Sequence, residues 1–100
     1  MNITEIKVFP VEEERLKAYV TIILDNCFVI RDLKVINGTG GLFVAMPSKK
    51  RKDGTFKDIA HPLNKETREM MEQKILAAYH EELKKPAGER GRHGDDREQG

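Results

Sequence analysis

The chain has 100 residues, of which 38% are hydrophobic and 35% are charged, so its length allows one small, polar domain. The longest apolar run, residues 20–24, is far shorter than a membrane-spanning helix, and no apolar export signal stands near the start, so we expect a cytoplasmic protein. The single cysteine, Cys27, excludes an intramolecular disulfide and a cysteine-based zinc site.

The net charge of +1, from 18 basic and 17 acidic residues, suggests at first that no charged partner exists. The charges are unevenly distributed, because residues 49–57 hold five basic residues against Asp53 alone and carry +4, whereas the remaining residues carry −3. A local field of this kind attracts a polyanion even where the total charge is near zero.

Alternating apolar residues predict the first strands of an antiparallel sheet. One strand is expected over residues 4–9, and a stronger one over residues 16–24, whose two apolar faces indicate a central position in the sheet. The turn pair Asp25-Asn26 joins this second strand to residues 27–36, and the three segments together predict a β-hairpin. Cys27, at the start of the second strand of this hairpin, is expected to be a small, half-buried apolar residue.

Two further turns are predicted beyond this hairpin. The glycine-rich residues 37–41 form the next break, with Asn37-Gly38 as the favoured central pair of the turn. Residues 42–60 predict a β-ribbon with a basic tip, because an Asp-Gly pair within them is another hairpin signal.

The hydrophobic period changes after residue 60 and predicts one C-terminal helix over residues 65–84. Asn64 is a suitable N-cap, because its side-chain oxygen can accept a hydrogen bond from an amide of the first turn, and Pro86 stops the helix. Six residues at helical spacing are expected to pack against one face of the sheet: Met71, Ile75, Leu76, Ala78, Tyr79 and Leu83.

The predicted fold class is therefore α+β. A single small domain, residues 1–85, contains an antiparallel sheet of four or more strands followed by one C-terminal α-helix, and residues 86–100 are a disordered polar tail whose composition cannot form a core. One helix covers only one face of such a sheet, so we expect a homodimer joined by sheet edges or by the helices. Without a partner some apolar side chains would be exposed, among them Tyr19, Ile23, Phe28 and Ile30.

The leading functional candidate is a run of four cations at the predicted ribbon tip: Lys49, Lys50, Arg51 and Lys52. Neighbouring cations repel one another unless an anion approaches, phosphates are the commonest such partner, and a two-stranded ribbon fits the major groove of DNA. Arg51 has the bidentate fork that can read guanine. The expected nucleic-acid contacts extend to Lys57 and, more weakly, to Lys65 and Arg68. A solvated loop that only aids solubility is the alternative.

Catalytic and metal-binding patterns are weak. The glycines of residues 37–41 lack a following Lys-Ser or Lys-Thr and a helix, so hairpin geometry is favoured over a phosphate cradle, and a nucleotide-binding enzyme is only a third hypothesis. The three histidines lack metal-ligand spacing. We expect no enzyme, no metal, no cofactor and no small-molecule substrate. Four helix acids are expected to lie on a solvated face: Glu69, Glu72, Glu81 and Glu82.

Residues 35–62, VINGTGGLFVAMPSKKRKDGTFKDIAHP, resemble the signature of the stage V sporulation protein G (SpoVG) family. The opening stretch ITEIKVF at residues 3–9 and the helix start LNKETR at residues 63–68 also resemble that family. The similarity extends over about residues 1–84 without a gap, and a contiguous match of this length is far more specific than any short motif.

This resemblance implies a small bacterial cytoplasmic protein that dimerises, binds DNA and in some members RNA, and regulates septation, sporulation or gene expression. It also implies an antiparallel sheet followed by a C-terminal helix, nucleic-acid contact through residues 49–52, and association with the nucleoid in the bound state. A protein-interaction adaptor that acts through the exposed sheet face or the acidic helix is the alternative.

Overall fold

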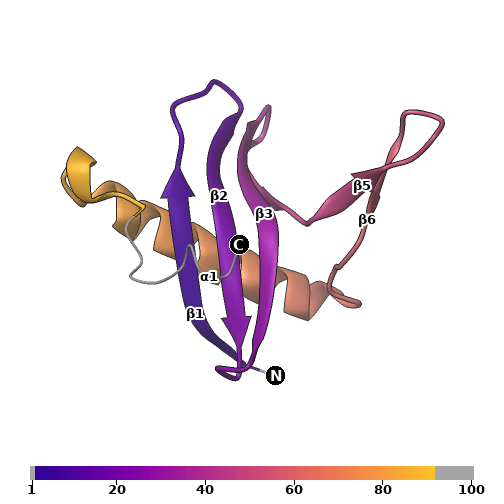
Figure 1. The fold of residues 1–100 in the computed structure, drawn as a ribbon, viewed down its shortest axis with the longest axis horizontal. Coiled ribbons are helices and arrows are strands. Elements are labelled where there is room, and N and C mark those ends of the chain that lie inside the picture. The colour runs from indigo at the N-terminus through magenta and orange to yellow at the C-terminus, as the bar shows by residue number, and fades with distance from the viewer. Residues whose placement is uncertain (1, 92–100) are drawn as a thin grey trace.

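The computed structural model describes residues 2–91, which form an antiparallel sheet, a separate two-stranded ribbon and one long helix (Figure 1). The main sheet has the strand order β1-β2-β3-β4, so the prediction of an α+β fold with the second strand inside the sheet is confirmed. The elements in chain order are β1 (Ile3–Pro10), β2 (Leu16–Leu24), β3 (Phe28–Gly38), β4 (Gly41–Ala45), β5 (Ser48–Lys50), β6 (Phe56–Asp58), α1 (Lys65–Leu83) and the 3-10 helix η1 (Ala87–Glu89).

The core lies between α1 and one face of this sheet, and Figure 1 shows the helix crossing behind the strands. Strand residues alternate between faces, so every second residue of β2 points toward the helix. Each fully buried aliphatic side chain stabilises the fold by about 1.5–3 kcal/mol on leaving water. The buried apolar residues are Val8, Ala18, Val20, Ile22, Leu33, Val35, Val44, Met46, Ile75 and Tyr79.

The turn between β2 and β3 is built by Asp25 and Asn26, as predicted. Both residues have positive φ, 51° and 57°, a conformation that Asp and Asn tolerate better than most residues. The prediction for Cys27 is wrong: it is exposed and belongs to the turn, because its N–H donates to the carbonyl of Leu24 at 3.0 Å and β3 begins only at Phe28.

The turn between β3 and β4 lies two residues later than predicted. Gly38 pairs with Gly41 across the strands, so the loop consists of Thr39 and Gly40, and Asn37-Gly38 belongs to β3. Gly41 supplies the required backbone, because its φ of 118° is costly for any residue with a Cβ atom.

The prediction of one ribbon over residues 42–60 is wrong in its first part. Strand β4 pairs with β3 in the main sheet, and the ribbon contains only β5 and β6. The chain leaves the sheet at Met46 and Pro47, which are both buried, and proline has no N–H with which to continue the ladder.

Helix α1 begins where predicted, because Asn64 Oδ1 accepts a hydrogen bond from the Thr67 N–H at 2.8 Å. The predicted solvated acid face is wrong for two residues. Glu72 is half-buried, and its Oε2 accepts a hydrogen bond from the Val44 N–H at 3.2 Å. Glu82 is only 4% exposed and pairs with Lys85 at 3.1 Å.

The chain after α1 differs from the predicted disordered tail as far as Gly91. Its N–H donates to Glu82 Oε2 at 2.7 Å, and Arg90 Nη2 donates to the carbonyl of Leu83 at 2.8 Å. Backbone and side-chain hydrogen bonds therefore fix a turn that composition alone did not indicate. The rest of the predicted tail, residues 92–100, lies outside the described residues. In the part of the chain that is described, no helix is long and apolar enough to cross a membrane.

Candidate nucleic-acid interface

The ribbon of β5 and β6 projects away from the main sheet, as Figure 1 shows, and all of its side chains from residue 48 to residue 59 are exposed. The register pairs Lys49 with Lys57 and Lys50 with Phe56. Because strand residues alternate, these two pairs point to opposite faces of the ribbon. One face therefore presents two ammonium groups, and the other presents an ammonium group and a phenyl ring.

The tip of the ribbon is a hydrogen-bonded loop. The Arg51 N–H donates to the carbonyl of Thr55 at 2.6 Å, and the Gly54 N–H donates back to the carbonyl of Arg51 at 3.0 Å. Gly54 has a φ of 92°, which favours glycine. The loop holds Lys52 at its apex, next to Asp53.

Asp53 is the acid that stabilises this loop. Its Oδ1 accepts hydrogen bonds from the Thr55 hydroxyl at 2.7 Å and from the Thr55 N–H at 3.0 Å. The hydroxyl hydrogen bond, followed by the amide hydrogen bond, lowers the pKa of Asp53 below its ordinary value of 3.8. Asp53 is therefore ionised at neutral pH and orders the loop while reducing its positive charge.

Asp53 and Asp58 lie beside the basic residues of the ribbon but form no ion pair with them. Within residues 2–91, no ion pair links an acid to the five predicted cations, Lys49, Lys50, Arg51, Lys52 and Lys57. These residues surround a shallow hollow of about 500 Å³ that also includes Asp58 and Ile59. The structure thus brings together all five of the stronger predicted contacts.

The two weaker predicted contacts, Arg68 and Lys65, differ in their position relative to the ribbon. Arg68, on the first turns of α1, lines a hollow of about 470 Å³ together with Lys57, Phe56, Asp58 and His61, so it extends the ribbon surface. Lys65 lines neither of these two hollows and lies 3.9 Å from Glu69 in an exposed helical pair.

Phe56 is a residue that sequence reasoning missed. Its side chain is 69% exposed and faces Lys50 across the ribbon. A two-residue turn at Asp53-Gly54 would have placed Phe56 opposite Arg51, whereas the observed three-residue loop places it opposite Lys50; either count sets the ring beside a cation.

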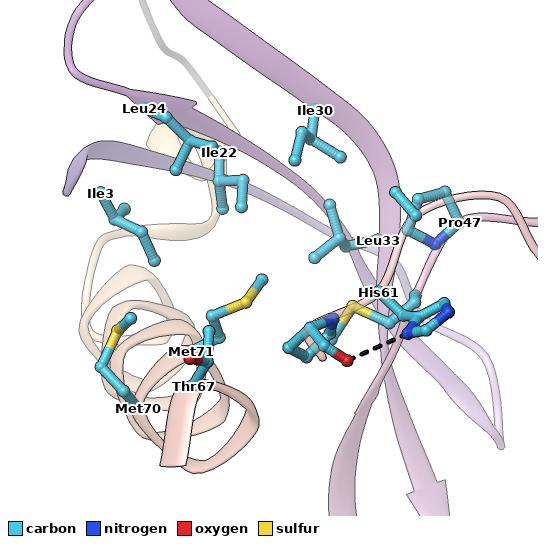
Figure 2. A pocket seen from close by; sticks show the side chains of 13 residues that line it. Ile3, Ile22, Leu24, Ile30, Leu33, Pro47, His61, Thr67, Met70 and Met71 are labelled. Carbon is cyan, nitrogen blue, oxygen red and sulfur yellow. Dashed lines mark hydrogen bonds between the residues drawn. The ribbon is translucent and has the colours of Figure 1, made fainter. Parts of the chain in front are cut away.

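A separate apolar pocket of about 360 Å³ lies between the sheet and the first half of α1. Figure 2 shows Ile22, Leu24, Ile30 and Leu33 from the strands facing Met70, Met71 and Thr67 from the helix. His61 closes one side, with its Nδ1 at 3.0 Å from the carbonyl of Pro62. Among the described residues, no group of three His, Cys, Asp or Glu side chains could hold a metal ion.

Comparison with known proteins decides the family. The SpoVG family model matches residues 1–81, which include the main sheet, the ribbon and nearly all of α1. The chain belongs to the SpoVG family. The resemblance seen in the sequence is thereby confirmed.

Several SpoVG relatives carry the name "Putative septation protein SpoVG". A protein of Anaeromyxobacter sp. (strain Fw109-5) is 70% identical over 97 residues, which cover 95% of this chain and all of the relative. A protein of Myxococcus xanthus (strain DK1622) is 71% identical over 83% of this chain and 84% of its own length. A more distant one, from Clostridioides difficile (strain 630), is 51% identical over 83% of this chain and 91% of its own.

Proposed function

We propose that this SpoVG-family protein is a nucleic-acid-binding regulator whose ribbon contacts the phosphates of DNA, and also of RNA. The observation that carries the proposal is the direct pairing of Lys49 with Lys57 on one face of the ribbon. Like charges directly opposite each other destabilise a sheet, and an anion bound between them removes that cost.

The remaining ribbon residues fit the same ligand. Lys50 and Arg51 continue the positive surface around the tip, and Arg68 continues it toward α1. Arg51 is the residue we expect to read guanine, because a guanidinium forms two parallel hydrogen bonds to its major-groove edge. The lysines are expected to bind phosphates regardless of sequence.

Salt dependence provides the first test. A dimer in which each protomer neutralises about four phosphates should show a log–log salt slope near −7. Replacing Lys49, Lys50, Arg51 and Lys52 by alanine should flatten this slope in a fluorescence-anisotropy titration with a labelled duplex. An unchanged slope would remove the ribbon from the proposal.

A matched pair of double variants separates a local contact from a general charge effect. Lys49→Ala/Lys57→Ala and Lys74→Ala/Lys84→Ala each remove two positive charges from exposed positions. Only the ribbon variant should weaken binding strongly. Equal losses in the two variants would mean that total charge, and not the ribbon, controls affinity.

We also propose that the protein acts as a homodimer, without catalysis and without a cofactor, and that it associates with the nucleoid. Three exposed apolar side chains occur between β6 and the start of α1: Phe56 and Ile59 are each 69% exposed and Leu63 is 91% exposed. Burial of these side chains against a second copy would stabilise a dimer. Sedimentation velocity at micromolar concentration tests this, and a purely monomeric species would contradict it.

A further inference from the structure

The face of the sheet that α1 leaves open carries two exposed aromatic rings. The strands pass in front of α1 in Figure 1, so that view is onto this face. Tyr19 points to it because its neighbours Ala18 and Val20 are buried on the helix side. Phe43 points to it for the same reason, since Val44 is buried. Tyr19 and Phe43 are 42% and 40% exposed.

The strand register places a lysine between the two rings. Tyr19 on β2 pairs with Lys34 on β3, and Phe43 on β4 pairs with Ile36, the next residue of β3 on the same face. With strands about 4.8 Å apart and same-face residues about 6.8 Å apart along a strand, the two rings are separated by roughly 12 Å. They are too far apart to stack on each other, and each presents its own surface.

The cations of this face have unused hydrogen-bonding capacity. Lys34 forms no ion pair with an acid in residues 2–91, and Lys17, beside Tyr19 on β2, donates only to the carbonyl of Glu13, at 2.7 Å. A bound phosphate would accept hydrogen bonds from both of these ammonium groups.

The accessible part of the face is limited to one end. Lys7 and Thr21 form the next row and are 4% and 6% exposed, so a ligand would reach only the end built by the start of β2, the end of β3 and β4. The acid at the opposite end of the face, Glu5, lies 4.0 Å from Lys7. Asp32 is exposed at the bulge of β3, beside the buried row.

Exposed rings alternating with cations on a sheet match the chemistry of an unpaired nucleic-acid strand. Bases stack on aromatic rings whatever their sequence, and phosphates pair with the cations between them. A duplex keeps its base faces stacked inside and cannot use the rings. An apolar protein surface could cover the rings, but it would leave the cations without partners.

We propose that this open sheet face, with Tyr19, Phe43, Lys34 and Lys17, binds single-stranded nucleic acid. The proposal rests on the proposed function in taking nucleic acid as the ligand, and it adds a second surface and a different form of the ligand. The ribbon would engage duplex, and the sheet face would engage unpaired nucleotides.

Two probes and two variants test this assignment. A short oligothymidylate and a short mixed-sequence duplex are titrated with the Tyr19→Thr/Phe43→Thr variant, in which threonine keeps a good strand propensity. We expect affinity for the single strand to fall about tenfold for each ring removed, with duplex affinity unchanged. The control is Phe28→Thr, since Phe28 is 55% exposed but pairs with Leu24 and so points to the helix side.

The outcomes separate this inference from the proposed function. Unchanged single-strand affinity in the double variant overturns the inference, as does duplex binding without any single-strand binding by the native protein. Failure to bind either probe overturns the proposed function and this inference together. A double variant that becomes monomeric, with single-strand affinity retained, would assign the face to self-association and overturn the inference.

Tyrosine emission gives a direct readout of stacking. The chain has two tyrosines and no tryptophan, and Tyr79 is buried, so the Tyr79→Phe variant reports on Tyr19 alone. Oligothymidylate should quench this emission and high salt should restore it, whereas Tyr19→Phe should keep the affinity because the ring remains. Emission that saturating oligothymidylate leaves unchanged would contradict stacking on Tyr19.

Discussion

Glu72 on α1 accepts a hydrogen bond at Oε2 from the backbone N–H of Val44 on β4, at 3.2 Å. Strand β4 is the last strand of the main sheet, so this amide has no further strand to bond. The helix thus supplies through a side chain the acceptor that a fifth strand would otherwise supply. This contact protects an edge that could pair with another chain.

Replacing Glu72 by alanine should lower the free energy of unfolding by about 1–2 kcal/mol, because a half-buried amide loses its acceptor. Glu72→Gln should retain most of the stability, since its side-chain carbonyl can still accept. Urea denaturation measures both changes. Glu69→Ala, which removes an exposed acid from the same helix, is the control, and an equal loss there would show that the Val44 contact is unimportant.

The tip of the ribbon should loosen in acid. Since the pKa of Asp53 is lowered in the folded protein, its ionised form adds stability to the loop above the ordinary pKa of 3.8, and this stability is lost as the pH falls through the folded pKa. The carboxyl resonance of Asp53 should therefore titrate below pH 3.8 in an NMR titration. Thr55→Val removes the hydroxyl donor, the larger cause, and should raise the pKa. An unshifted midpoint in the native protein would contradict the loop geometry.

Reversing one charge on the ribbon should stabilise the ribbon while weakening its binding to duplex DNA. Lys57→Glu places an acid opposite Lys49, so it replaces a repulsive cross-strand pair by an attractive one worth about 0.2–1 kcal/mol. We expect slower amide hydrogen exchange in β5 and β6 together with weaker duplex binding. Faster exchange would mean that the Lys49–Lys57 pair is not a source of strain. Lys74→Glu supplies the control for net charge.

The core should be sensitive to the loss of one helix side chain. Ile75 is fully buried where α1 crosses the sheet, and Ile75→Ala should cost about 2–5 kcal/mol, a large share of the stability of so small a domain. Ile75→Val, which removes one methylene, should cost about 0.5–1.5 kcal/mol and keep the fold measurable. Urea denaturation distinguishes the two, and equal small losses would show that α1 is loosely packed.

Local patterns were sufficient to predict most of the fold. The two-residue period of residues 16–24 and the helical period from Met71 to Leu83 each follow from side-chain direction alone, and Asn64 marked the helix start by its own chemistry. The basic ribbon could be located for the same reason, because its cations and its Asp-Gly turn are contiguous.

The incorrect predictions concern features that depend on contacts between residues far apart in the sequence. The separation of β4 from the ribbon depends on the burial of Pro47, and the burial of Glu82 depends on Gly91, which returns to it after the helix ends. The bond from Val44 to Glu72 requires the angle at which α1 crosses the sheet, and no periodicity encodes that angle. Placing Tyr19, Lys34 and Phe43 on one face of the sheet requires the register of β2, β3 and β4, which the sequence pattern does not supply.

The root of the ribbon has a mechanical consequence. The carbonyl of buried Pro47 accepts the Ile59 N–H at 2.7 Å, so both strands of the ribbon leave the body through one clamped point. The ribbon should therefore move as one rigid unit about this hydrogen bond, and its two strands should not separate at their base. The loop between Arg51 and Thr55 lies at the other end of the ribbon. Insertions in this loop would therefore change how far the ribbon extends from the sheet without changing the hydrogen bond at its base.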